Sequence, residues 1–281
     1  MRFLKELWAL TRFEHAIMLV IAVFIGESLA LGKIPDFTLA IFLSFLVPMF
    51  SEMGSFALND YLDIESDKIN NRTDRPLVRG SISPKFALWF SMITILASLF
   101  IAWFINLSAF VISLLFNVLA LLYNFKLKDL PLLGNLYIAI TMAIPFIFGN
   151  FVVVSKLSSM SLLLATLGFV SGLAREIVKS IQDMKCDTEA RKSKTLPLVV
   201  GQENSLRIAC FLYLVFIPLS ILPFLTGLKF SPYSVFLVAF ADAGLLYNIF
   251  LLIRFKDYKT GRKLSLICLF IGLLGLFLAV L

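Results

Sequence analysis

The chain has few of the side chains that bind transition metals or activate nucleophiles. It contains one histidine, His15, and three cysteines, Cys186, Cys210 and Cys268, without a metal-ligand spacing. A single histidine nearly excludes a histidine-based metal site or a Ser-His-Asp triad. An odd number of widely spaced cysteines does not form a disulfide framework, so we expect the three thiols to be reduced.

Charge is also scarce, because only 15% of the 281 residues are charged and 60% are hydrophobic. That composition is far from the composition of a soluble domain. Residues 1–13 are short and mixed, and they do not resemble a removable signal peptide. The net charge of +7 could suggest nucleic acid, but in so apolar a chain we expect the basic residues in loops, where they set membrane topology. The sequence therefore predicts a membrane protein without a nucleic-acid partner.

Long apolar stretches recur along the whole chain. A helix needs roughly 20 apolar residues to cross a bilayer. The stretches of suitable length are 13–31, 37–61, 85–105, 107–123, 130–154, 157–181, 206–228, 231–255 and 264–281. The predicted fold is all-α and integral to the membrane, with nine transmembrane helices. Asn106 alone separates the third from the fourth, which requires a tight hairpin.

Carboxylates cluster at two places where an apolar stretch ends. Asp63 and Asp67 are four residues apart, as are Asp183 and Asp187, so each pair lies on one face of a helix. Carboxylates this close repel one another unless they bind cations, and oxygen ligands suit magnesium that is shared with a phosphate. These four aspartates are the candidate catalytic residues for chemistry on a diphosphate. The candidate metal ligands are Asn59, Asp60, Asp63, Asp67, Asp183 and Asp187.

The connections that follow the two clusters resemble each other. Each continues with basic residues and then Pro-Leu-Val-x-Gly, in which Pro76 and Pro197 follow the last aspartate by nine and ten residues. We infer a duplicated four-helix unit within one membrane-embedded domain, 1–281. The repeats are 13–128 and 130–255, and the ninth helix, 264–281, is appended. Internal pseudo-symmetry commonly places a membrane site at the interface of the repeats.

Lysine and arginine divide unevenly between alternate connections. Only Lys33, Lys156 and Lys229 fall on one side, whereas most of the 25 basic residues fall on the other. Because basic loops stay on the cytoplasmic side, this pattern places the N-terminus and both acidic clusters in the cytoplasm. The C-terminus is then expected outside, in a multi-pass protein of the cell membrane.

Basic and aromatic residues near the acidic clusters are candidates for binding a phosphorylated substrate. Arg175 and Lys179 continue the stripe of Asp183 into the sixth stretch, where a charge costs about 2.5–3.5 kcal/mol unless it faces a wet cavity or a partner. Arginine binds phosphate bidentately and lysine acts as a point charge. Plain snorkelling, local pairing with Glu176 or control of topology stay open as alternatives. The candidates are Arg72, Arg75, Lys126, Lys128, Lys179, Lys194, Tyr123 and Arg175.

These motifs together resemble the membrane-embedded UbiA-type prenyltransferases along essentially the whole chain. The matching elements are Asn59-Asp60-x-x-Asp63-x-x-x-Asp67, Arg72-x-x-Arg75-Pro76-Leu77, Asp183-x-x-x-Asp187 and the nine helices. The resemblance implies transfer of an isoprenoid chain from a polyprenyl diphosphate to an aromatic or lipid acceptor, with Mg²⁺. It implies membrane lipids as surroundings and gives no reason to expect an obligate protein partner.

Within this family the chain is most similar to the archaeal branch that transfers a geranylgeranyl group to geranylgeranylglyceryl phosphate. The cues are 71–76, Leu133-Gly134-Asn135 and 175–179. Two features depart from this branch. Arg12 is followed by Phe13-Glu14-His15, which resembles some quinone-pathway members. The family carries a lysine four residues after a tyrosine, and Lys126 and Lys128 lie on either side of that position after Tyr123. An aromatic acceptor such as 4-hydroxybenzoate therefore remains an alternative.

Two other classes of protein are more distant alternatives. CDP-alcohol phosphotransferases also use paired aspartate motifs, but they carry one contiguous signature, whereas Asp67 and Asp183 lie far apart in this sequence. A transporter would suit pseudo-repeats and charges within the membrane. The charges here concentrate at the inner face, however, and a transporter needs them near the midplane.

Overall fold

A computed structural model describes residues 2–69, 71–186, 188 and 193–281 of the chain. In these ranges the chain is helical and forms no strand. Nine helical segments of the described chain are long and apolar enough to cross a membrane, which confirms the predicted fold class. The spans are α2 (Phe13–Leu31), α3 (Leu39–Leu62), α5 (Pro84–Ile105), α6 (Leu107–Phe125), α7 (Leu133–Val153), α8 (Ser159–Cys186), α10 (Gln202–Leu219) continued by α11 (Leu222–Thr226), α12 (Pro232–Phe255) and α13 (Tyr258–Val280).

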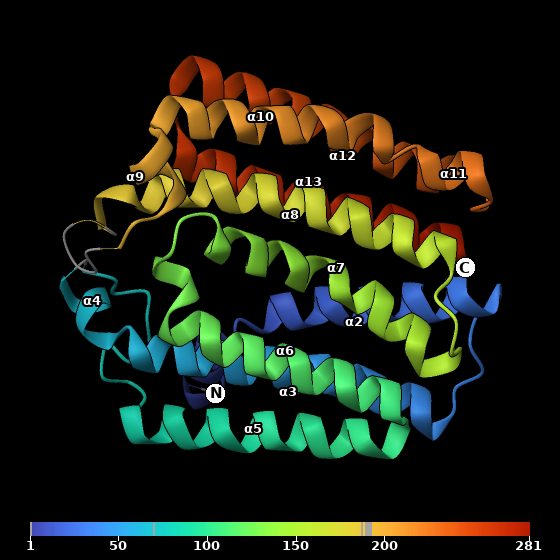
Figure 1. Ribbon diagram of the computed structural model, residues 1–281, viewed down its shortest axis with the longest axis horizontal. Helices are drawn as coiled ribbons and strands as arrows, with labels where there is room; N and C mark the ends of the chain where they lie inside the picture. Colours follow the sequence, from blue (N-terminus) through green and yellow to red (C-terminus); the bar gives the residue numbers. More distant parts are fainter. Residues whose placement is uncertain (1, 70, 187, 189–192) are drawn as a thin grey trace.

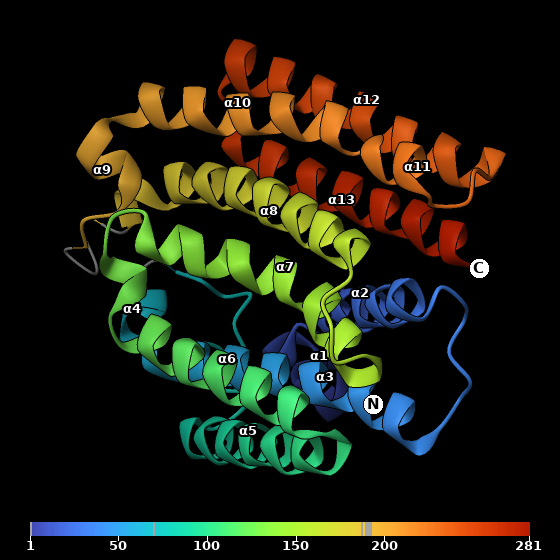
Figure 2. The ribbon, with the colours of Figure 1, turned by 45° about the vertical axis from the view of Figure 1, so that its right-hand side comes forward.

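The helices stack in successive pairs between two edges of the bundle. Figures 1 and 2 both show α10 and α12 along one edge, then α8 with α13, then α7 with α2, then α3 with α6, and α5 along the other edge. The short helices α4 (Ile64–Ile69) and α9 (Leu196–Val200) lie together at one end of the bundle, and the C-terminus lies at the other (Figure 1). The short helices that follow Asp63 and Asp183 in the chain therefore lie at the same end of the bundle.

Several helix ends differ from the predicted ones for local reasons. The helix α13 begins six residues before the predicted start, because Asp257 caps it by accepting a hydrogen bond from the Thr260 N–H at 3.0 Å. The seventh span is interrupted after Pro218, which lacks the N–H that an unbroken helix needs. The short helices α1 (Arg2–Thr11), α4, η1 (Leu127–Asp129) and α9 were not predicted.

The predicted tight hairpin at Asn106 is confirmed. Helix α5 ends at the residue before it, and α6 begins at the residue after it. The Asn106 Oδ1 accepts a hydrogen bond from the Ala109 N–H at 2.8 Å, which caps α6. Its Nδ2 donates to the carbonyls of Phe151 and Val152 at 3.0 and 3.1 Å, so the hairpin is also tied to the end of α7.

Helix α2 packs on α7 with almost no space between the two backbones. A Cβ added at Gly149 would lie 2.2 Å from the Val23 carbonyl oxygen, and one added at Gly26 would lie 2.4 Å from the Phe146 carbonyl oxygen. Within a membrane, helices associate through such close contacts between small residues, because lipid supplies no hydrophobic drive. This packing fixes α2 beside α7 in the middle of the bundle, next to the cavity that contains the predicted site.

Candidate active site

The first acidic cluster sits where α3 ends. Asp63 is the C-cap of α3, and its N–H donates to the Asn59 carbonyl at 3.0 Å. The Asp67 N–H donates in turn to the Asp63 carbonyl at 2.8 Å, so helical hydrogen bonding continues into α4 although the helix is interrupted at Asp63. Asn59, Asp63 and Asp67 therefore keep the predicted stripe, and all three line one large cavity.

This cavity has a volume of about 650 Å³ and is lined by residues of both halves of the chain. Asp183 of the second cluster lines it from α8. Arg72 lies near both clusters, because the charges of Asp67 and Asp183 both raise the pKa of its guanidinium. Asp187, the other aspartate of the second cluster, lies outside the described residues.

Asp63 is held by two neighbours at the cavity wall. The Lys128 Nζ lies 2.6 Å from the Asp63 Oδ1, and both side chains are buried. The Asn59 Nδ2 donates to the Asp63 Oδ2 at 3.1 Å and to the Asn124 Oδ1 at 2.9 Å. A buried ammonium on this carboxylate balances its charge in the free protein, at the place where a substrate-bound cation would lie.

Asp60 has different surroundings, although it was predicted as a metal ligand. It does not line the cavity, and its side chain is 1% exposed. Its Oδ1 accepts hydrogen bonds from the Arg12 Nη2 at 2.7 Å and from the Arg75 Nη1 at 2.9 Å. The Arg12 guanidinium also lies 4.1 Å from the centre of the Phe56 ring. Asp60 thus anchors two cavity-lining arginines, and we do not include it among the proposed ligands.

The predicted substrate-binding residues divide into two groups. Those that line the cavity are Arg72, Arg75, Lys128, Tyr123, Arg175 and Lys179. Lys126 and Lys194 are exposed and do not line it. Lys126 is the C-cap of α6. The Lys194 N–H donates to the Asp129 carbonyl at 3.0 Å.

Arg72 is a permanent positive charge at the mouth of the cavity. The Arg72 Nε donates to the Asp74 Oδ1 at 3.1 Å. This hydrogen bond raises the pKa of Arg72 more than partial burial lowers it, and the nearby charges of Asp74, Asp67 and Asp183 act in the same direction as the hydrogen bond. Arg72 can therefore face a diphosphate without losing its proton.

Aromatic rings lie beside these charges. Tyr123 and Tyr137 both line the cavity, and their rings stack with centroids 4.6 Å apart at an interplanar angle of 25°. Tyr61, next to Asp60 at the end of α3, packs instead against a separate cluster around Leu10 and Ala57. The stacked pair presents an electron-rich face that can stabilise developing positive charge on carbon.

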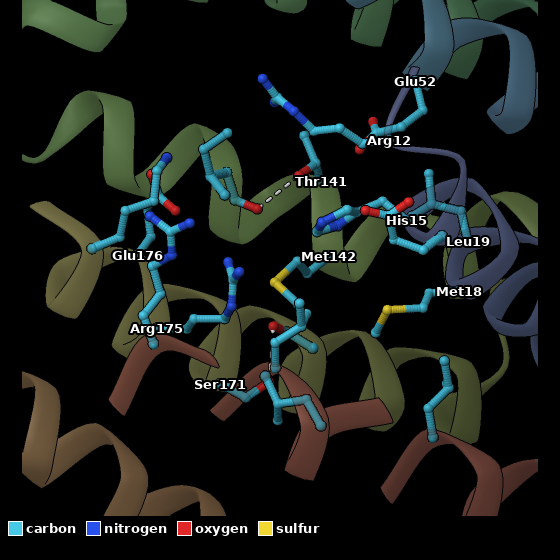
Figure 3. Close-up of a pocket in the computed structure, with 18 of the residues that line it drawn as sticks. Arg12, His15, Met18, Leu19, Glu52, Thr141, Met142, Ser171, Arg175 and Glu176 are labelled. Atoms are coloured by element: carbon cyan, nitrogen blue, oxygen red, sulfur yellow. Dashed lines mark hydrogen bonds and ion pairs between the residues drawn. The ribbon is translucent and has the colours of Figure 1, made fainter. Parts of the chain in front are cut away.

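Some cavity residues were missed or undervalued by the sequence reasoning. Arg12, the N-cap of α2, and His15 in its first turn both line the cavity. The available signal was two ionisable residues close together at the start of an apolar stretch. Figure 3 shows both on the same side of the cavity as Glu52, opposite Arg175 and Glu176. Arg262 and Lys263 also line it, but the predicted ninth helix began after them, so they were interpreted as loop charges.

The donor set suits a cation that is shared with a substrate. Among the described residues no three His, Cys, Asp or Glu side chains converge into a preformed metal site. Asp63, Asp67 and Asp183 nevertheless offer carboxylate oxygens to one cavity. Magnesium usually takes one or two carboxylates and completes its shell with water and substrate phosphate oxygens. The residues present therefore fit magnesium bound together with a phosphorylated ligand.

In the described part of the chain, nine apolar spans and a cavity lined by carboxylates, arginines and lysines define a membrane enzyme that binds an anionic substrate. The UbiA prenyltransferase family matches residues 19–274 of the chain. The chain is also 37% identical over 286 residues to digeranylgeranylglyceryl phosphate synthase of Archaeoglobus fulgidus, covering 98% of this chain and 95% of that protein. The chain belongs to the UbiA prenyltransferase family and is a multi-pass membrane prenyltransferase.

Solved structures have the same fold. A structure of digeranylgeranylglyceryl phosphate synthase superposes with a TM-score of 0.75 at 30% identity, covering 100% of this chain and 99% of that chain. A UbiA homologue of Archaeoglobus fulgidus, solved with DMAPP and Mg²⁺ bound, gives a TM-score of 0.66 at 18% identity and covers 96% and 99% of the two chains. The second likeness concerns the fold alone.

Proposed function

We propose that this prenyltransferase transfers a geranylgeranyl group from geranylgeranyl diphosphate to the free hydroxyl of geranylgeranylglyceryl phosphate. The observation that carries the proposal is the single cavity that Asp63, Asp67 and Asp183 line together. The identity of 37% to digeranylgeranylglyceryl phosphate synthase, over nearly the full length of both proteins, supports this choice of donor and acceptor. The product would be the doubly prenylated glycerol phosphate of archaeal-type ether lipids.

The polar end of the cavity would bind the donor's diphosphate. Arg72 and Arg75 from the connection after α4, and Lys128 from η1, face this region and can donate hydrogen bonds to its oxygens. Magnesium held by Asp63, Asp67 and Asp183 would supply neutralisation of the charge that grows on the leaving diphosphate. The UbiA homologue that binds DMAPP and Mg²⁺ supports this assignment of the cofactor.

The chain's own residues would then shape the reaction at the allylic carbon. The bond between this carbon and the diphosphate oxygen breaks, and its electron pair leaves with the diphosphate. The stacked faces of Tyr123 and Tyr137 stabilise the positive charge that develops on the carbon. The acceptor hydroxyl oxygen forms the new ether bond and loses its proton. The products are the diprenyl ether, diphosphate and this proton.

The apolar part of the cavity would hold the prenyl chain. It extends from the charged end between α8, α10, α12 and α13, with only a few polar groups such as Ser220 and Asp242 on its wall. The apolar lining residues there include Leu164, Leu167, Phe216, Val238, Leu269 and Leu276. A long isoprenoid gains from transfer into such a space in proportion to the apolar area that it buries.

We further propose that the charged end of the cavity opens to the cytoplasm and that the C-terminus lies outside the cell membrane. The basic residues support this orientation, because they concentrate in the connections at the end of the bundle that holds α4 and α9. The two water-soluble parts of the substrates, a diphosphate and a glycerol phosphate headgroup, would then meet the enzyme from the cytoplasm.

Product analysis tests the proposed function. Purified enzyme in lipid would receive labelled geranylgeranyl diphosphate with geranylgeranylglyceryl phosphate or with 4-hydroxybenzoate, each with Mg²⁺ and with excess chelator. We expect a diprenyl glycerol phosphate only with the first acceptor and only with Mg²⁺. Prenylated 4-hydroxybenzoate as the main product would contradict the acceptor, and undiminished turnover in chelator would contradict the role of Mg²⁺.

A further inference from the structure

A second group of cations lines the cavity on the wall formed by α8 and α13. We call it the α8–α13 cationic cluster, and its members are Arg175, Lys179, Arg262 and Lys263. It is separate in the chain from Arg72, Arg75 and Lys128, which belong to the connections after α4 and α6. Arg72, Arg75 and Lys128 already provide three cations for one diphosphate. The α8–α13 cationic cluster adds four more to the same cavity.

The acids of the same wall do not balance these cations. Only Glu176 and Asp183 line the cavity from α8, and α13 contributes no acid to the lining. The Lys179 Nζ lies 2.7 Å from the Glu176 Oε1, which accounts for one of the cations. Asp183 belongs to the proposed magnesium ligands. Among the described lining residues, four cations against two acids give this wall a surplus of two positive charges.

Arg175 shows the imbalance most clearly. Its Nε is buried and has no hydrogen-bond partner among the described residues, and its guanidinium is aimed at the cavity near Met142 (Figure 3). Arg262 donates to a neutral oxygen there, the Gln182 Oε1, at 3.4 Å. A buried guanidinium without a full set of acceptors is costly, and an anionic ligand that supplies them removes the cost.

We propose that the α8–α13 cationic cluster binds the phosphate monoester of the acceptor. This inference rests on the proposed function and adds a second anion site to the same cavity. A dianionic phosphate matches the two unbalanced charges, and its oxygens can accept from the arginine N–H groups. His15 lines the same cavity and lies on the side opposite Arg175 (Figure 3).

The arrangement would place the reacting groups between the two anions. The diphosphate would be held at Arg72, Arg75 and Lys128, and the acceptor phosphate across the cavity at the α8–α13 cationic cluster. The free hydroxyl of a glycerol phosphate lies one or two carbons from its phosphate, so fixing the phosphate aims the hydroxyl at the allylic carbon. The cluster would therefore select a phosphorylated acceptor over the same glycerol ether without its phosphate.

Steady-state kinetics with two acceptors tests this inference. The substitutions are Arg262→Gln and Lys263→Gln, and the acceptors are geranylgeranylglyceryl phosphate and geranylgeranylglycerol, each with geranylgeranyl diphosphate and Mg²⁺. We expect each variant to raise the KM for the phosphorylated acceptor by about 10- to 100-fold, the loss of a hydrogen bond to a charged group. The KM for the donor and the rate with the dephosphorylated acceptor should stay within about twofold, since neither involves the lost contact.

Lys259→Gln is the matched control, because Lys259 lies one turn before Lys263 on α13, is exposed and does not line the cavity. Arg262→Lys should recover part of the acceptor affinity, which a folding defect would not allow. An equal rise in the donor KM, or an unchanged acceptor KM, would overturn the inference while leaving the proposed function intact. A wild-type enzyme that ignores the phosphorylated acceptor would overturn the proposed function itself and this inference with it.

Discussion

At the scale of single residues, two lysines in one short connection have opposite surroundings. Lys128 is buried against Asp63 at 2.6 Å, whereas Lys126, two residues earlier, is exposed and outside the cavity lining. Lys126 precedes η1 and Lys128 lies within it, and in a 3-10 helix, with three residues per turn, side chains two residues apart point in different directions. We therefore assign Lys128 to donor binding and Lys126 to membrane topology.

Substitution of the two lysines should therefore have unequal effects. Lys128→Ala should weaken binding of geranylgeranyl diphosphate about 10- to 100-fold, as expected for loss of a hydrogen bond between charged groups. Lys126→Ala should leave it within about twofold. Equilibrium binding of a labelled donor in the presence of Mg²⁺ measures both, and equal losses for the two variants would contradict the assignment.

Asp60 supports a different kind of prediction. Its buried carboxylate forms ion pairs with Arg12 and Arg75, so Asp60→Asn removes the negative charge from both pairs. Loss of one partner from a buried pair costs roughly 3–5 kcal/mol, and we expect the lower end because the Arg12 and Arg75 side chains are 20% and 16% exposed. The apparent melting temperature should fall by at least about 5 °C.

The Mg²⁺ concentration for half-maximal activity should change little in Asp60→Asn. Asp63→Asn should instead change the Mg²⁺ requirement strongly, because Asp63 lines the cavity and Asp60 does not. A shift of the metal requirement in Asp60→Asn as large as in Asp63→Asn would instead restore Asp60 as a ligand.

The residues of the site were predictable from the sequence to different degrees. Asp63, Asp67 and Asp183 were recognisable, because each pair of acids follows an apolar stretch and helical spacing fixes their common face. The partners of Asp60 were not, since Arg12 lies 48 residues away in the chain and only the folded bundle brings it within 2.7 Å.

At the scale of the helices, glycine determines how closely α2 can approach α7. Gly149→Ala places a Cβ 2.2 Å from a backbone oxygen that cannot move without moving α2. Overpacking of this kind costs about 1–3 kcal/mol, so we expect a lower melting temperature and reduced activity. Gly272→Ala is the control, because its Cβ would meet only the Ala241 Cβ at 3.6 Å. Equal melting temperatures for the two variants would contradict the packing.

Hydropathy predicted the spans well, and it predicted their ends less well. Residues 13–31 form α2 as expected, since a helix that crosses the membrane is recognised by its length and apolar composition. The start of α13 depends on one capping hydrogen bond at Asp257. Hydropathy placed the start at 264 instead, because the residues before it include several charges. That error moved Arg262 and Lys263 out of a helix and away from the site.

At the scale of the whole molecule, the proposed orientation can be tested with single cysteines. In a background with Cys186, Cys210 and Cys268 replaced by alanine, Lys68→Cys should react with an impermeant maleimide only in inside-out vesicles. Lys33→Cys, also at an exposed position but at the other end of the bundle, should react only in right-side-out vesicles or whole cells. Reaction of Lys68→Cys from outside would contradict the orientation.

The internal duplication of 13–128 and 130–255 stays a prediction.

The shape of the cavity was beyond the reach of the sequence, because it depends on which helices become neighbours. Two acidic ends with matching downstream loops predicted that the clusters would meet. They did not indicate that Arg12 and His15 from α2 would join them, or that α13 would complete the wall. Those contacts follow from the packing of α2 between α7 and α13, which no local pattern encodes.

The central claim is that Asp63 and Asp183 hold one shared magnesium–diphosphate unit. The most direct test is the affinity for geranylgeranyl diphosphate with and without Mg²⁺ for Asp63→Asn, Asp183→Asn and the double variant, with Asp36→Asn at the exposed opposite end as control. We predict that each single variant loses most of the Mg²⁺-dependent gain in affinity and that the double variant is scarcely worse, since groups that act as one unit are not additive. Effects that simply add, or a full Mg²⁺-dependent gain in either single variant, would contradict the account.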